Sequence, residues 1–367
     1  MGSVSQFHNG ERPLAHRIES EEEALTIARQ LSASFALQSS ERDINRILPH
    51  TEIDALFASG LGAITVPPEF AGLDIGNALL GEIVAIIAEG DPSIGECLEA
   101  HFSTLERLRA TGSESLQQVS YERVLAGERF TTAVLQDTTT IQSDQLAHRI
   151  TGRSLPATAL LFSDWIAVIE AGQAGEGVEV YLPRDAGGLQ CLDDWDGFGQ
   201  RTNGTGTLIA NDVRAAGDTT AHVDRSTPSL VPALEALMHA GTALGIARSV
   251  LAGLREPQSS SRLGKLMVDI EATAALIQRA GGRIDLAQVG PSTRSIEAAT
   301  FSAMAAKAIA GTTALEASGL LFELSSTATT SIGLNLDRHW RNARLHGAGH
   351  TVAEIYSRVG NLQRTDG

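Results

Sequence analysis

The sequence predicts an α+β protein in which a helical region, a β region and a second helical region follow one another along the chain. Three observations lead to this fold class. Apolar residues recur at helical spacing from Ser20 to about Leu125, strand-length apolar pieces follow between about Gly127 and Ala216, and long Ala- and Leu-rich stretches begin near Pro228. The 367 residues suffice for two or three domains, which we place at residues 1–125, 126–222 and 223–367.

The first region shows the apolar repeat of helices that pack one face on a core. Three stretches carry it, and their apolar positions are Ala24, Ile27, Ala28 and Leu31, then Ile53, Leu56 and Phe57, then Ile83, Ala85 and Ile86. The segment VPPEFAGLDIG, which contains Pro and Gly, interrupts the pattern and predicts a loop between helices.

Short strands are expected in the second region and long helices in the third. The strand-length pieces are FTTAVL, LAHRITG, WIAVIEA, GVEVYLP and TGTLIAND. Separated by Gly, Asp, Asn and Pro turns, they predict a compact antiparallel sheet or a barrel-like domain. Four amphipathic stretches follow, at residues 229–255, 262–283, 292–325 and about 337–358, and they predict a C-terminal four-helix bundle.

Charge and targeting patterns exclude several partners. The chain has 44 acidic residues against 28 Lys and Arg, a net charge of −16 that would repel a polyanion. No apolar run reaches the length of a membrane span, and the first residues lack the order of a signal peptide. We therefore expect a cytoplasmic protein that binds neither nucleic acid nor a membrane, with Cys97 and Cys191 as free thiols.

The stretch NLDRHWRNARLHGAGH at residues 335–350 is basic in an acidic chain. Its imidazoles, His339, His346 and His350, have no Cys or acidic ligand nearby at a customary spacing, and the HExxH pattern is missing from the sequence. We therefore expect no metal site here. Neither GxGxxG nor a P-loop occurs, so a nucleotide cofactor would need another kind of site.

Four stretches of the chain resemble the acyl-CoA dehydrogenase family. They are LPHTEIDALFASGLGAITVPPEFAGLD (48–74), IIAEGDPSIGECLEAHF (86–102), DWDGFGQRTNGTGTLIANDVRA (194–215) and NLDRHWRNARLH (335–346). The last two are similar to the flavin-dependent monooxygenases on this fold, the branch that includes dibenzothiophene monooxygenase. The resemblance implies an acyl-CoA dehydrogenase-like fold with an N-terminal helical domain, a central β-barrel-like domain and a C-terminal four-helix bundle.

This resemblance also implies an activity. A two-component monooxygenase of this kind receives reduced FMN or FAD from a separate reductase and uses O2 to oxygenate a small molecule. The expected substrate is a small aromatic, heteroaromatic or amine compound, free or as its CoA thioester, in a catabolic or specialised pathway. The expected assembly is a homotetramer, or a dimer, formed through the C-terminal bundles.

Two alternatives remain open. An acyl-CoA dehydrogenase needs a carboxylate base, but Gly347 stands where many members carry that glutamate. A displaced base would then come from another bundle helix, with Glu316 and Glu323 as candidates. The second alternative is a flavin-less relative without catalysis, because Thr132, Gln136, Pro156 and Gly349 replace residues of the branch pattern.

The resemblance implies a set of site residues. The candidate catalytic residues are His346, His101 and His350, because imidazoles can manage the proton on the reacting oxygen. The candidate flavin-binding residues are Thr131, Thr132, Ala133, Leu135 and Gln136, then Thr158 and Trp165, then Ser326, Thr327 and Thr329 in the turn SSTATTSIG. A lone His on an apolar helix is more often a bonded core residue, and this reading stays open for His101.

Overall fold

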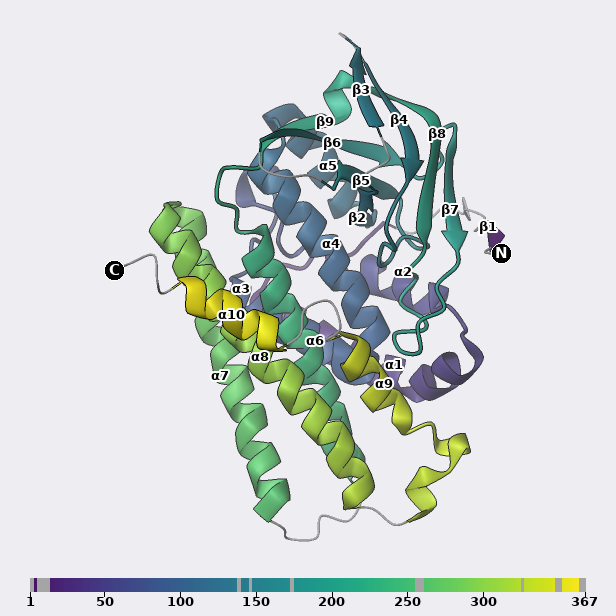
Figure 1. The fold of residues 1–367 in the computed structure, drawn as a ribbon, viewed down its shortest axis with the longest axis vertical. Helices are drawn as coiled ribbons and strands as arrows, with labels where there is room; N and C mark the ends of the chain where they lie inside the picture. The colour runs from purple at the N-terminus through teal and green to yellow at the C-terminus, as the bar shows by residue number, and fades with distance from the viewer. Residues whose placement is uncertain are drawn as a thin grey trace.

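The computed structural model describes residues 3–4, 14–136, 140–144, 147–171, 175–254, 261–324, 327–346 and 352–362. Figure 1 shows the β sheets at one end of the molecule and the long C-terminal helices at the other, with the N-terminal helices between and beside them. Within the described residues, no helix is long and apolar enough to cross a membrane.

The N-terminal region is helical, as predicted. Its helices are α1 (Glu21–Asn45), α2 (His50–Ala58), α3 (Asn77–Gly90), α4 (Pro92–Thr111) and α5 (Glu114–Leu125), with short 3-10 turns at Leu61–Ala63 and Pro68–Phe70. Side chains cap three of the helix starts. Ser20, Asp91 and Ser113 each accept a hydrogen bond from a main-chain N–H in the first turn of α1, α4 and α5.

The β region consists of two sheets. One has the order β1 (Ser3–Val4), β7 (Leu189–Asp193), β8 (Thr207–Ala216), β4 (Ala147–Arg153) and β3 (Thr140–Asp144), and the other has the order β2 (Phe130–Leu135), β5 (Trp165–Glu170), β6 (Glu176–Pro183) and β9 (Thr220–Asp224). Apolar residues from both sheets, including Ile150, Val168 and Leu208, form one buried cluster.

One strand pair departs from the antiparallel expectation. β2 and β5 are parallel, with Phe130 opposite Trp165 and Leu135 opposite Glu170. The chain leaves the sheet after β2, forms the β3–β4 hairpin in the other sheet, and re-enters beside β2 in the same direction. Such a crossover is what parallel neighbours require, and it leaves β2 at the edge of its sheet.

The C-terminal region is also helical, but its last element differs from the prediction. α6 (Val231–Gly253), α7 (Ser261–Val289) and α8 (Thr293–Glu323) pack against one another. The single helix expected at about 337–358 is wrong. The structure has α9 (Asp337–His346) and α10 (Val352–Leu362) instead, on either side of a segment containing Gly347 and Gly349 that lies outside the described residues.

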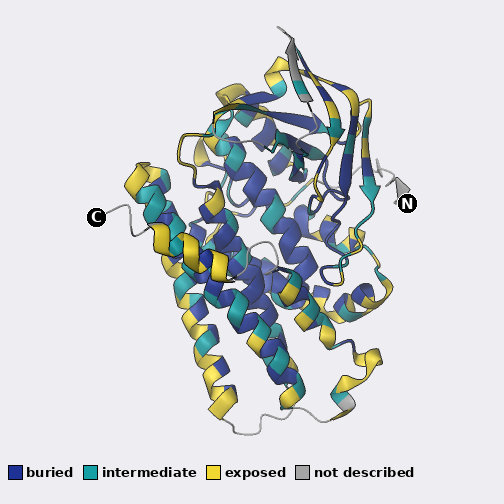
Figure 2. Cartoon of the chain, in the orientation of Figure 1, coloured by how far each residue is buried: buried dark blue, intermediate teal, exposed yellow. Residues whose placement is uncertain are grey.

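The two helical regions share one hydrophobic core. α3 packs against α6 and α7, and α4 packs against α6. Their buried side chains belong to a continuous cluster that includes Ile83, Leu98, Leu237 and Ile277. Figure 2 shows this buried zone running through the middle of the helices, while the outer faces of α7 and α10 are exposed.

Close contact between α3 and α6 depends on glycine. A Cβ atom added to Gly245 would lie 2.4 Å from the main-chain oxygen of Ala85 and 2.8 Å from the nitrogen of Glu89. Gly245→Ala should therefore lower the free energy of unfolding by about 1–3 kcal/mol, measured by urea denaturation. Gly253→Ala on the same helix is the matched control, since nothing lies within 4 Å of its added Cβ, and an equal loss there would contradict the packing argument.

Candidate functional site

Helix α4 links the β sheets to the C-terminal helices. At its C-terminal half, the Thr104 hydroxyl lies 2.9 Å from the Thr132 hydroxyl on β2. At its N-terminal half it carries Glu96 and Glu99, which approach histidines of α6 and α9. Five residues of helix span about 7.5 Å, so Glu99 and Thr104 lie within one and a half turns of each other along one helix. The predicted flavin strand and the acidic and imidazole groups therefore contact the same helix, with Glu99 and Thr104 pointing about 140° apart around its axis.

His346, the last residue of α9, is held between two acceptors. Its Nδ1 lies 2.7 Å from Glu96 Oε1, and its Nε2 lies 2.9 Å from the main-chain oxygen of His239. A carbonyl oxygen only accepts, and a carboxylate accepts, so both ring nitrogens donate and the ring is an imidazolium. Burial lowers the pKa of His346, but the hydrogen bond and the charge of Glu96 outweigh this effect and raise the pKa above its ordinary value.

Glu96 is held from a second side. Asn203 Nδ2, from the segment between β7 and β8, donates to Glu96 Oε2 at 2.6 Å. The side chains of Glu96 and His346 are only 11% and 3% exposed, so this ion pair is shielded from solvent. Both partners are thereby fixed, because neither carboxylate oxygen of Glu96 and neither nitrogen of His346 lacks a hydrogen bond.

A second imidazole lies directly against His346. The rings of His239, on α6, and His346 are stacked, with centroids 3.4 Å apart and 13° between their planes. His239 Nδ1 lies 3.4 Å from Glu99 Oε1, whereas Glu99 Oε2 is buried and has no hydrogen-bond partner among the described residues. Burial raises the pKa of Glu99 to about 7, with His346 and Lys307 lowering it and Glu96 and Glu235 raising it.

Glu99, His239 and His346 each place one potential metal-ligand atom within 4.8 Å of the others. Two features oppose a shared ion. The ring planes are nearly parallel, so the in-plane lone pairs do not converge on one point. In addition, both nitrogens of His346 donate to protein acceptors. Glu99, His239 and His346 are therefore better suited to binding protons than to binding a metal ion.

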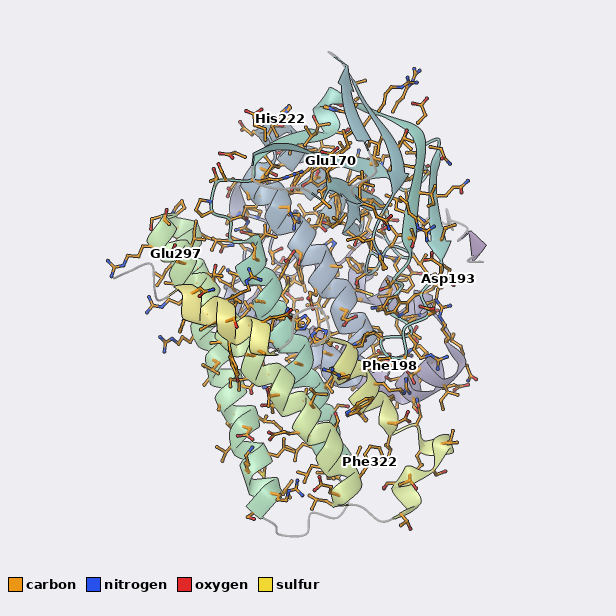
Figure 3. The ribbon with its side chains drawn as sticks, viewed as in Figure 1. Glu170, Asp193, Phe198, His222, Glu297 and Phe322 are labelled. Atoms are coloured by element: carbon orange, nitrogen blue, oxygen red, sulfur yellow. The ribbon has the colours of Figure 1, made fainter. Side chains whose placement is uncertain are left out.

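α9 is anchored so that His346 reaches this cluster. Arg341 pairs with Asp43 of α1 at 2.7 Å and donates to the main-chain oxygen of Phe198 at 2.9 Å. Asn342 accepts from the main-chain N–H of Gln200 at 2.8 Å. Figure 3 shows Phe198 beside α9, where its ring stacks on that of Trp340. One basic residue of this stretch, Arg341, thus forms an ion pair that fixes the helix.

His101, a predicted catalytic residue, is a bonded core residue in this structure. The main-chain N–H of Phe130 donates to its Nδ1 at 3.0 Å, and its Nε2 lies 2.9 Å from the oxygen of Gly62. A main-chain N–H only donates, so the ring is neutral with its proton on Nε2. Burial lowers the pKa of His101 to about 4. This geometry favours a structural role that ties α4 to β2, and a catalytic role for His101 stays a prediction without geometric support.

The edge of β2 that faces away from β5 carries main-chain groups of the predicted flavin-binding residues. On the edge away from β5, the N–H of Phe130 bonds His101, and the oxygen of Val134 accepts from Leu155. Thr132 lies between them, and strand alternation turns its N–H and C=O to the same edge. Among the described residues this pair of groups has no partner. An open donor and acceptor at this position fit the pyrimidine ring of a flavin.

The other predicted flavin residues of the β region are mostly engaged within the protein. Thr131 donates its hydroxyl to the oxygen of Thr158 at 2.7 Å, and Ala133 and Leu135 are buried between the sheets. The N–H of Gln136 donates to the oxygen of Arg153. For all of these, a flavin contact stays a prediction.

Trp165, the predicted flavin-binding residue on β5, is partly buried and has partners within the chain. Its indole N–H donates to Glu128 at 2.6 Å, and the guanidinium of Arg123 lies 3.7 Å above its ring. Its ring is also stacked on that of Phe130, with 6.3 Å between the ring centroids. The indole therefore already has a hydrogen-bond acceptor and a cation on one face, and a direct flavin contact stays a prediction.

A single chain does not bring all the predicted flavin residues together. Thr327 and Thr329 lie in the 3-10 turn Thr327–Thr330 between α8 and α9, which Figure 1 shows at the opposite end of the molecule from β2. Ser326 and the predicted catalytic His350 lie outside the described residues. These threonines would reach a flavin only in an assembly where one copy faces another.

Sequence reasoning missed Glu96, Glu99 and His239. A signal existed for the first two, because the matched stretch IGECLEAHF places two carboxylates at i and i+3, on neighbouring positions of one helix face. Nothing in the sequence pointed to His239. It lies 140 residues from Glu99 and 107 residues from His346, so only the packing of α6 against α4 and α9 shows the cluster.

The two curated relatives described in this paragraph are monooxygenases. No family model matches the chain. Among curated proteins, a probable FMNH2-dependent monooxygenase of Pseudomonas putida is 26% identical, with 88% of this chain and 89% of the relative covered. The dibenzothiophene monooxygenase of Mycolicibacterium goodii is 25% identical, with 92% of each covered.

Solved structures give the same fold. FMN-bound dibenzothiophene monooxygenase of Paenibacillus sp. A11-2 superposes with a TM-score of 0.82 at 22% identity, covering 92% of this chain and 96% of that chain. Butyryl-CoA dehydrogenase of Megasphaera elsdenii superposes with a TM-score of 0.81 at 18% identity, covering 95% and 99%. The predicted fold class is confirmed. The chain has the acyl-CoA dehydrogenase fold and is related, over most of its length, to the flavin-dependent monooxygenases built on that fold.

Proposed function

We propose that the protein is the oxygenase of a two-component system, which takes reduced flavin from a separate reductase and uses O2 to oxygenate a small molecule. The observation that carries this proposal is the buried Glu96–His346 pair, with His239 and Glu99 against it, one and a half helical turns from the predicted flavin strand. The curated relatives support FMN as the flavin, since the first of them is described as FMNH2-dependent.

The residues present fit a flavin at the edge of β2. The N–H and C=O of Thr132 would bind the pyrimidine ring, and Thr132 is itself held by Thr104. When bound, reduced flavin would supply the two electrons that O2 accepts. The chain would place a fixed positive charge, the imidazolium of His346, near the developing charge on oxygen. The buried surroundings of His346 and Glu96 would exclude water from this region.

The substrate class follows the relatives and stays broad. Small aromatic, heteroaromatic and amine compounds, free or as CoA thioesters, fit the proposal. Relatives of this fold include a dibenzothiophene monooxygenase and an amino sugar nitrososynthase of Streptomyces peucetius. We propose a cytoplasmic homotetramer or dimer, in which a neighbour brings Thr327 and Thr329 toward the flavin.

The displaced-base dehydrogenase has less support. Glu316 is 54% exposed and pairs with Lys265 at 2.8 Å, and Glu323 is 48% exposed and pairs with Arg262. Both carboxylates lie on the outer surface between α7 and α8, which is not where a base could meet a buried thioester. The flavin-less alternative remains distinguishable by flavin binding alone.

Flavin titration tests the proposal. We expect the purified protein to bind reduced FMN more tightly than oxidised FMN, and to consume O2 when a flavin reductase supplies the reduced form. Anaerobic titration, followed by flavin absorbance and fluorescence, measures the first, and an oxygen electrode the second. Anaerobic bleaching of tightly bound FAD by an acyl-CoA would favour a dehydrogenase. Failure to bind FMN or FAD in either redox state would favour a flavin-less relative.

A further inference from the structure

The proposed reaction needs a proton that the Glu96–His346 pair is poorly placed to donate. Reduced flavin in its anionic form carries one proton and two electrons. When O2 accepts both electrons and forms H2O2, or forms water and an oxygenated product, one further proton must come from elsewhere. The residue that the sequence suggested for this task, His346, has both nitrogens donating to protein acceptors. Releasing a proton would break its ion pair with Glu96, so His346 is poorly placed as a donor.

We propose that Glu99 supplies this proton, and that His239 and His346 act as positioning residues for it. The inference rests on the proposed function and deepens it. Glu99 Oε2 is buried and has no hydrogen-bond partner among the described residues, so this carboxyl oxygen is not committed to another protein group. The other oxygen, Oε1, faces His239, whose ring is fixed by stacking on His346.

The surroundings of Glu99 suit a group that gains and loses a proton near neutral pH. Charged and titratable groups face it from each neighbouring element: Glu96 on α4, Glu235 and His239 on α6, Lys307 on α8 and His346 on α9, with Arg358 of α10 acting on Lys307. Burial raises the pKa of Glu99 to about 7 and lowers that of Lys307. Glu99 is therefore protonated in a large fraction of molecules at neutral pH, and the nearby imidazolium of His346 stabilises the carboxylate after proton release.

The step balances without another reactant. The O–H bond of protonated Glu99 breaks, and its proton joins the oxygen that the flavin has reduced. Reduced flavin becomes oxidised flavin, and O2 becomes H2O2 when no substrate is present. Glu99 is left as a carboxylate and recovers its proton from solvent. The fold offers a matched comparison, since Glu106, on the same helix, also has a pKa raised to about 7 by burial but bonds Gln288 at 3.1 Å.

The test compares Glu99→Gln with Glu106→Gln in full-length protein loaded with reduced FMN. Oxygen is added in stopped flow between about pH 5.5 and 8.5, and H2O2 release is followed. In wild type, H2O2 should be released fastest below pH 7, and the rate should fall as pH rises and Glu99 loses its proton. Glu99→Gln should be roughly 10²-fold slower at the acid end, with a flat pH profile, while Glu106→Gln keeps the wild-type profile. Glu99→Asp should regain part of the rate and of the pH dependence.

A second readout does not depend on turnover. The infrared spectrum of Glu99→Gln is subtracted from that of wild type at each pH. In this difference spectrum, the band of the protonated carboxylic acid should disappear as pH rises, with a midpoint near the Glu99 pKa of about 7. Both Gln variants should also unfold at higher denaturant above pH 7, because each removes a buried carboxylate that is costly when ionised. An unchanged pH profile in Glu99→Gln that still binds FMN would overturn the inference. Loss of FMN binding by wild type would instead overturn the proposed function.

Discussion

His346→Leu should lower the free energy of unfolding by about 3–5 kcal/mol at pH 6. The substitution removes the cation of a buried pair and, among the described residues, leaves Glu96 with only Asn203 as a hydrogen-bond partner. It also removes the donor to the oxygen of His239. Urea denaturation measures the loss, which should exceed that of an exposed pair such as Arg149–Asp212, where Arg149→Met should cost less than about 1 kcal/mol.

The pH dependence of this loss has a definite sign. The pKa of His346 is raised in the folded state, so the pair contributes its full stability below the ordinary value of 6.5 and loses it as pH rises through the folded-state value. The difference between wild type and His346→Leu should therefore shrink at alkaline pH. The double variant Glu96→Gln/His346→Leu should recover part of the loss, because no unpaired charge remains. If the single and the double variant lost the same unfolding free energy, the loss would come from altered packing and not from an unpaired charge.

Much of the fold could be predicted because its signals are local. The apolar spacing that ends near Leu125 and the strand-length pieces from FTTAVL to TGTLIAND match α5, β2 and β8 within a few residues. Two features could not be read this way. The parallel pairing of β2 with β5 depends on a crossover through the other sheet. The presence of two helices, α9 and α10, in place of the one expected could not be read from apolar spacing, which does not show where one helix ends and the next begins.

The candidate site was harder to predict, for a physical reason. The sequence pointed to His346 because its whole stretch matches a known pattern. The chemical state of that ring is set by Glu96, 250 residues away, and by a main-chain oxygen of α6. His101 illustrates the opposite case. It also lies in a matching stretch, with a core role left open, and two main-chain partners keep its ring neutral and occupied. Residue type and spacing identify which groups can do chemistry, whereas long-range hydrogen bonds decide which of them are available.

Arg42→Met should be the second substitution with a large effect, although Arg42 lies outside the site. Arg42, on α1, is buried and donates to Asp91 at 2.8 Å, to Glu52 at 2.7 Å and to the oxygen of Phe35 at 2.6 Å. Asp91 caps the start of α4 by accepting from the N–H of Ser93 at 3.0 Å. Removing the guanidinium leaves a buried carboxylate without its cation, and we expect a loss of about 3–5 kcal/mol in the free energy of unfolding.

The pH dependence of this second loss separates charge from packing. Burial raises the pKa of Asp91, and the charge of Arg42 partly offsets this. Without Arg42 the pKa should rise further, so the deficit of Arg42→Met should be largest at neutral pH and decrease as acid protonates Asp91. Hydrogen exchange should show the first turn of α4 losing protection before the rest of the helix. Glu96 and Glu99 follow on the same helix, so its first turn supports the candidate site. If the loss of unfolding free energy were independent of pH and α4 kept its protection from exchange, Arg42 would act by packing and would not hold this helix.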